Sequence, residues 1–96
     1  LDGALVSVGQ DVKIGRTCQL LTPQHPVDYM ERRGTCGTSH PIVIGDDTWL
    51  GGGVIVCPGV TIGCRCIIAA GSVVIRDIPD DCMAAGNPAV VKKHLR

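Results

Sequence analysis

The sequence predicts an all-β fold, a left-handed parallel β-helix of hexapeptide repeats with about three coils. The first observation is that an aliphatic residue recurs every six positions, at Ile44, Leu50, Val56, Ile62, Ile68 and Val74. The second is that a small or β-branched residue stands two positions earlier each time, at Ile42, Thr48, Val54, Val60, Cys66 and Ser72. A period of six fits neither an amphipathic helix nor a simple strand meander. Because side chains alternate along a strand, both residues of each pair should point into a triangular prism.

The same pattern occurs once near the start of the chain, where its aliphatic members are Val8, Ile14 and Leu20. We expect these residues to stack, in this order, with Ile44, Leu50 and Val56. The next layer of the prism should consist of Ile62, Ile68 and Val74. Burial of these layers would drive folding.

The repeat fails between its first two coils, where Pro26, Arg32 and Thr38 occupy the inward phase. Residues from about 24 to 40 should therefore leave the prism as an extruded loop. A long loop in a tightly periodic fold is usually functional or disordered. Pro23 and Pro26 restrict the backbone on both sides of His25, so we expect this histidine to be held in place.

The repeat ends after Val74, and residues from about 78 to 96 should form a tail that caps the exposed strand edge. Within this tail, residues 89–95 are expected to form a short helix or an extended strand. The 96 residues suffice for a single domain. Because the chain starts at Leu1, we expect it to be a fragment or a processed chain.

Composition excludes several functional classes. The formal net charge is zero, so no general attraction to nucleic acid or to a membrane is implied. No apolar run approaches membrane length, and no signal peptide is visible. None of the six cysteines forms a C-x-x-C motif. We interpret them as small apolar residues in a reducing compartment, the cytoplasm, and favour this over disulfides or a metal site.

Several motifs carry a more specific signal. The motif V-S-V-G-Q-D-V-K-I-G is followed by Thr22 and then by a loop with His25-Pro26, Asp28 and Glu31-Arg32. After the loop come P-I-V-I-G-D-D-T-W-L-G-G, P-G-V-T-I-G, I-A-A-G-S-V-V and A-A-G-N-P-A. In this combination the chain resembles the maltose, galactoside and nodulation-factor O-acetyltransferases over nearly its whole length. The resemblance implies acetyl transfer from acetyl-CoA to a hydroxyl of a sugar or similar small acceptor. It also implies a homotrimer with active sites between subunits, which the flat faces of a prism would favour.

By this resemblance His25 is the catalytic base. A hydroxyl is a poor nucleophile at neutral pH, and a neutral imidazole can take its proton as it attacks the thioester carbonyl. Such help accelerates a reaction by about 10²–10⁴-fold. Because this scheme requires no serine or cysteine nucleophile, we predict direct transfer without an acyl-enzyme. His40 and His94 match no catalytic position, and we interpret both as ordinary surface or loop residues.

The resemblance also assigns binding residues. The positions that match cofactor contacts are Gly52, Ala70, Ile75, Arg76 and Lys93. The small residues among them would let the pantetheine arm lie close to the backbone, and the two cations could meet the phosphates of CoA. Asp2 matches an acidic acceptor-binding position. Two features depart from the family: Val90 replaces its usual arginine, and residues 33–39 lack its acidic and aromatic residues. We also expect the chain to lack the family's N-terminal helical segment, which would precede Leu1.

Other functions remain open from the sequence. A serine or amino-group acetyltransferase could use the same fold, since the fold does not set the acceptor. A γ-type carbonic anhydrase would need the three histidines as zinc ligands, but their spacing does not fit coil-to-coil stacking. A non-catalytic β-helix would need regular outward threonine ranks, which are missing. We therefore expect no metal site.

Overall fold

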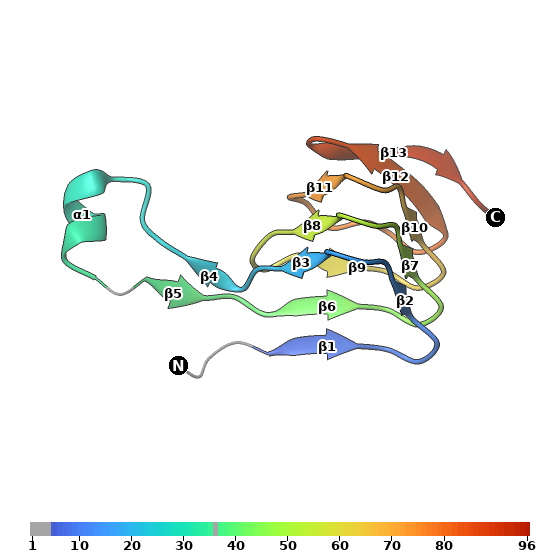
Figure 1. Ribbon diagram of the computed structural model, residues 1–96, viewed down its shortest axis with the longest axis horizontal. Helices are drawn as coiled ribbons and strands as arrows, with labels where there is room; N and C mark the ends of the chain where they lie inside the picture. The colour runs from blue at the N-terminus through green and yellow to red at the C-terminus, as the bar shows by residue number, and fades with distance from the viewer. Residues whose placement is uncertain (1–4, 36) are drawn as a thin grey trace.

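The computed structural model describes residues 5–35 and 37–96, which form a three-sided prism with one projecting arm (Figure 1). Each face is a set of short parallel strands that come from successive coils. The first face contains β1 (Val6–Val8), β6 (Ile42–Ile44) and β9 (Thr61–Ile62). The second begins with β2 (Lys13–Ile14), β7 (Trp49–Leu50) and β10 (Ile67–Ile68). The third contains β3 (Gln19–Leu20), β8 (Ile55–Val56) and β11 (Val73–Val74).

The strand register confirms the predicted stacking of the aliphatic residues. On the first face Val8 pairs with Ile44 and Ile44 with Ile62. The other two faces align Ile14 with Leu50 and Ile68, and Leu20 with Val56 and Val74. Between Ile42 and Val74 the inward side chains are almost completely buried. Each fully buried Val, Leu or Ile contributes about 1.5–3 kcal/mol relative to an exposed one, so these columns are the main source of stability.

The first coil lies at the open end of the prism. Val8 is 46% exposed and Ile14 is 43% exposed, although both occupy the inward columns. No strand in the described part of the chain lies beneath them, because β1 and β2 are the outermost members of their sheets. The position of a coil in the stack, and not the repeat pattern, therefore decides which inward side chains are buried from solvent.

The corners of the prism use glycine for close approach. A Cβ on Gly45 would lie 2.7 Å from the backbone nitrogen of Cys64 in the next coil, and one on Gly63 would lie 2.6 Å from that of Asp80. Left-handed backbone at neighbouring corner positions is adopted by other residues, among them Asp47 (φ 60°) and Arg65 (φ 57°). Glycine is thus needed where coils touch, more than where the chain turns.

The arm leaves the prism between β3 and β6 and consists of two strands and a helix (Figure 1). Strand β4 (Pro23–Gln24) pairs antiparallel with β5 (Thr38–Ser39), and α1 (Tyr29–Arg33) lies at the far end. The arm accounts for the elongated dimensions of 46 × 24 × 23 Å. Helix α1 is only five residues long, and nowhere in the described ranges is there a helix with the length and hydropathy to cross a bilayer.

The tail continues the faces of the prism beyond Val74. Ile78 forms a parallel bridge with Ile62 on the first face. On the second face, β12 (Cys82–Gly86) pairs parallel with β10, and β13 (Ala89–His94) returns antiparallel to cover β12. Of the two forms expected for residues 89–95, the structure has the strand.

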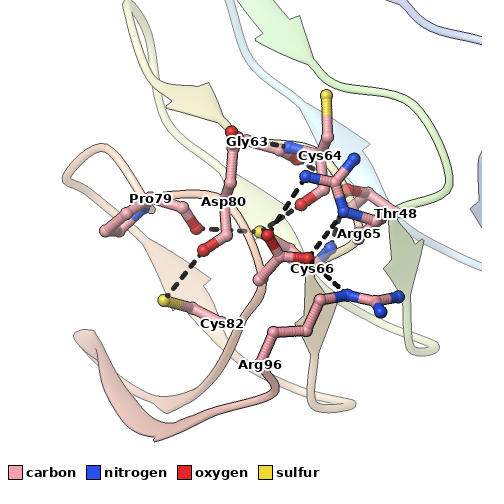
Figure 2. A network of polar contacts seen from close by, with 10 residues as sticks. Thr48, Gly63, Cys64, Arg65, Cys66, Pro79, Asp80, Cys82 and Arg96 are labelled. Carbon is pink, nitrogen blue, oxygen red and sulfur yellow. Dashed lines mark hydrogen bonds and ion pairs between the residues drawn. The ribbon is translucent and has the colours of Figure 1, made fainter.

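Buried polar contacts connect these coils (Figure 2). The fully buried Thr48 donates its hydroxyl to the carbonyl of Gly63 at 2.6 Å and accepts from the backbone N–H of Cys66 at 3.1 Å. Cys66 lies in the same column, and burial raises the pKa of its thiol. This side of the prism is therefore held by hydrogen bonds as well as by apolar contacts.

A charged cluster on the surface ties the tail to the prism. The guanidinium of Arg65 donates two hydrogen bonds to the carboxylate of Asp81, at 2.6 and 3.0 Å. Arg96 donates to the same carboxylate at 3.0 Å. The hydrogen bonds and charge of Arg65 lower the pKa of Asp81, and those of Asp81 raise the pKa of Arg65. This cluster joins the third coil to the C-terminus (Figure 2).

Candidate active site

His25 lies in the arm, directly after β4 and before Pro26. Its side chain is exposed, so an imidazole is available to a molecule that approaches the arm. The other two histidines each lie near a side chain of their own surroundings, His40 at the base of the arm and His94 on β13. The Nε2 atom of His40 lies 3.0 Å from the hydroxyl of Thr38, and Nδ1 of His94 lies 3.5 Å from the thiol of Cys82.

The loop motif around His25 organises the arm locally. Asp28 is the N-cap of α1, and its carboxylate accepts a hydrogen bond from the backbone N–H of Glu31 at 2.9 Å. The guanidinium of Arg32 returns to the start of the loop, where it donates to the carbonyls of Val27 at 3.2 Å and Pro26 at 3.4 Å. These contacts fix the backbone that follows His25.

Gly52 and Ala70 lie on adjacent coils at one corner of the prism. They are linked through a hydrogen bond from the N–H of Gly71 to the carbonyl of Gly52 at 2.9 Å. Both residues are exposed, and neither has a side chain beyond Cβ. A Cβ on Gly52 would meet only the carbonyl oxygen of Arg16, at 3.5 Å. An extended ligand could therefore run close to the backbone at this corner.

Ile75 and Arg76 follow β11, and the second of them lines a hollow of about 210 Å³. The wall of this hollow consists of Arg76, Asp77, Ile78, Ala89, Val90 and Val91. Ile75 is 46% exposed beside it in the sequence. Because Val90 contributes no charge, Arg76 is the cation of this lining, which also contains the carboxylate of Asp77, and the guanidinium is its candidate contact for an anionic group.

The structure separates the predicted site residues into distinct groups. Lys93 is exposed on β13, opposite Met83, and does not line the hollow. The β4–α1 segment that carries His25 projects away from the prism that carries the other candidates (Figure 1). Asp2, the predicted acceptor residue, lies outside the described residues.

Sequence reasoning missed two features of the site. Asp77 and Ala89 line the hollow although neither belongs to the repeat, and only the return of β13 brings Ala89 beside Ile78. Gly37 lies against the imidazole of His25, with which no sequence motif connects it. Within residues 5–35 and 37–96, no three His, Cys, Asp or Glu side chains gather in a way that could hold a metal ion.

Comparison with known proteins identifies the fold class of this chain. Residues 41–76 match the family model described as bacterial transferase hexapeptide (six repeats). A Vibrio cholerae hexapeptide-repeat acetyltransferase in complex with acetyl-CoA has a TM-score of 0.92 and 42% identity, and the match covers 95% of this chain and 50% of that one. A galactoside acetyltransferase in complex with coenzyme A has a TM-score of 0.91 and 40% identity, with 95% and 46% covered. The prism is thus a left-handed β-helix of hexapeptide type.

Curated relatives agree. A Saccharomyces cerevisiae protein with a provisional acetyltransferase name is 50% identical over 95 residues, which are 99% of this chain and 48% of the relative. The galactoside O-acetyltransferase of Escherichia coli is 39% identical over 95 residues, 99% of this chain and 47% of the relative. Over nearly its whole length the chain is therefore similar to hexapeptide-repeat acetyltransferases, among them galactoside O-acetyltransferases. It spans about half the length of the curated relatives it matches.

Proposed function

We propose that the protein transfers an acetyl group from acetyl-CoA to a hydroxyl of a sugar or similar small acceptor, with His25 as general base. The observation that carries this proposal is the exposed imidazole on an arm whose backbone Asp28 and Arg32 hold. Solved relatives at 40–42% identity contain acetyl-CoA or coenzyme A, which supports the same co-substrate here.

The chemistry needs only a correctly placed base. The imidazole of His25 takes the proton of the acceptor hydroxyl while the hydroxyl oxygen forms a bond to the thioester carbonyl carbon. The carbon–sulfur bond then breaks, and the CoA thiolate receives the proton from the imidazolium. Acetylated acceptor and free CoA leave, and the histidine is neutral again. No acyl-enzyme forms on this route.

The prism supplies candidate contacts for acetyl-CoA. At the corner of Gly52 and Ala70 the backbone is accessible, so that the amides of the pantetheine arm could pair with it. Arg76 at the hollow would attract the phosphates, and Lys93 on the adjoining strand would add a second cation. The family usually has an arginine at the position of Val90. Because Val90 is apolar, this hollow would offer a phosphate one positive charge fewer.

We further propose a homotrimer in which the arm of one subunit serves the prism of its neighbour. Helix α1 has no buried residue, and Val27, Tyr29 and Met30 are 92%, 57% and 57% exposed. A helix this short is not stable alone, so an apolar partner surface should cover it.

The cysteines support a proposal about the compartment. The described ones are all free thiols, which suits a reducing compartment, the cytoplasm: Cys18, Cys57, Cys64, Cys66 and Cys82.

The test is a panel of sugar, serine and amine acceptors with acetyl-CoA, followed by thiol release. We expect a sugar or related hydroxyl compound to give turnover, and His25→Ala to lower kcat by about 10²–10⁴-fold. His94→Ala is the matched control, because it removes a histidine that we place outside the site. A loss below about tenfold in the His25 variant contradicts the base assignment. Turnover confined to amines would favour the amino-group acetyltransferase.

A further inference from the structure

Gly37 lies opposite His25 across the two strands of the arm. The antiparallel register pairs Pro23 with Ser39 and Gln24 with Thr38, so the next pair toward the helix is His25 and Gly37. Gly37 is half-buried, although Thr38 beside it is exposed. The imidazole is therefore the side chain that covers the glycine.

A side chain at position 37 would occupy the place of this imidazole. A Cβ built on Gly37 would lie 2.7 Å from Nδ1 and 2.9 Å from Cε1 of His25, and 2.7 Å from the carbonyl oxygen of Gln24. Non-bonded carbon contacts have their optimum at about 3.5–4.0 Å, so even a methyl group would force the ring or the strand to move. The backbone adds a second requirement, because Gly37 has φ +87° and its N–H donates to the hydroxyl of Thr35 at 3.1 Å.

We propose that Gly37 is a positioning residue for His25, an inference that rests on the proposed function. Its missing side chain lets the imidazole lie against the backbone at position 37, just before β5, and this backbone then restricts the ring to fewer side-chain conformations. A base that is already oriented loses less entropy when the acceptor hydroxyl arrives. Gly37 itself touches no reacting atom, so its effect passes through the histidine.

The kinetic test replaces Gly37 by alanine in the assembled protein. Because a misplacement of about 1 Å can cost 10²-fold, we expect kcat to fall by about 10–100-fold, while KM for acetyl-CoA stays within about twofold. Gly59→Ala is the matched control. Gly59 has a similar φ of +80°, but a Cβ there would meet only the Cβ of His40, at an ordinary 3.5 Å. This control carries the same backbone strain without contact to His25, and its kcat should stay within about twofold.

A second readout does not depend on activity. In the unmodified protein, nuclear Overhauser effects should connect the Hα protons of Gly37 with the ring protons of His25. Their absence overturns the inference even if Gly37→Ala is inactive or fails to fold. Loss of turnover in His25→Ala together with a wild-type kcat in Gly37→Ala also overturns it, and leaves the proposed function intact. Full turnover in His25→Ala overturns both, whatever the Overhauser effects show.

Discussion

Replacing Asp28 by alanine should loosen the arm and leave the prism folded. The carboxylate of Asp28 accepts the hydrogen bond that begins α1, at 2.9 Å, and the helix has five residues, none of them buried. Loss of an N-cap aspartate typically costs about 1 kcal/mol, which corresponds to about a fivefold change in an equilibrium constant. We therefore expect kcat/KM to fall by up to about fivefold, because the ordered arm that presents His25 is less populated. The unfolding midpoint of the prism itself should change little, since α1 contributes no buried residue to its core.

Asp28→Asn is the matched control, because asparagine caps helices as well as aspartate does. Steady-state thiol release gives kcat/KM for both variants, and hydrogen exchange at the amide of Glu31 reports the cap directly. The alanine variant should exchange faster at this amide, and the asparagine variant should match the wild type in both measurements. If asparagine proves as damaging as alanine, the carboxylate acts through its charge, and the capping argument is refuted.

Three further outcomes follow from the structure. Thr48→Val removes two buried hydrogen bonds and should lower the free energy of unfolding, measured in urea at fixed protein concentration, by about 2–4 kcal/mol. Thr48→Ser keeps the hydroxyl and should retain most of the wild-type stability. A loss below about 0.5 kcal/mol in the valine variant would contradict the pairing. Arg76→Ala should raise KM for acetyl-CoA several-fold with kcat nearly unchanged, and a fall in kcat alone would argue against a phosphate contact. Because Arg65 lowers the pKa of Asp81 in the folded state, this carboxylate stabilises the protein above its unfolded pKa and ceases to do so as pH falls through its folded pKa. The melting temperature of Asp81→Asn should therefore depend less on pH in this acid range than that of the wild type, and parallel curves would show that the pair contributes nothing.

The sequence predicted the prism well because the repeat is local. Each inward aliphatic residue needs only its neighbours six positions away to define a strand and a corner, so the register that aligns Ile14, Leu50 and Ile68 follows from the pattern. The same reasoning could not predict which inward side chains are buried from solvent. Val8 and Ile14 have the same pattern as Ile44 and Leu50, and only their place at the end of the stack exposes them.

The parts of the site that the sequence did not predict arise from contacts outside the repeat. Strand β12 continues the second face with Cys82 and Ala84 in its buried positions, which are too small to extend the aliphatic pattern. Ala89 reaches the hollow only because β13 turns back. Gly37 meets His25 through an antiparallel pairing within the arm, and a single glycine carries no signal of its partner.

The proposal that an arm of one subunit serves the prism of another is tested most directly by mixing two inactive variants. His25→Ala removes the base, and Gly52→Phe should block the corner where the pantetheine arm would lie, at a position where a Cβ meets only the carbonyl oxygen of Arg16 at 3.5 Å. Each variant alone should be inactive. If sites form between subunits, random co-assembly of equal amounts should restore about a quarter of wild-type turnover, because that share of the interfaces combines an intact arm with an intact corner. If mixed assemblies form and remain inactive, each site lies within one chain, and the account of a shared site is wrong.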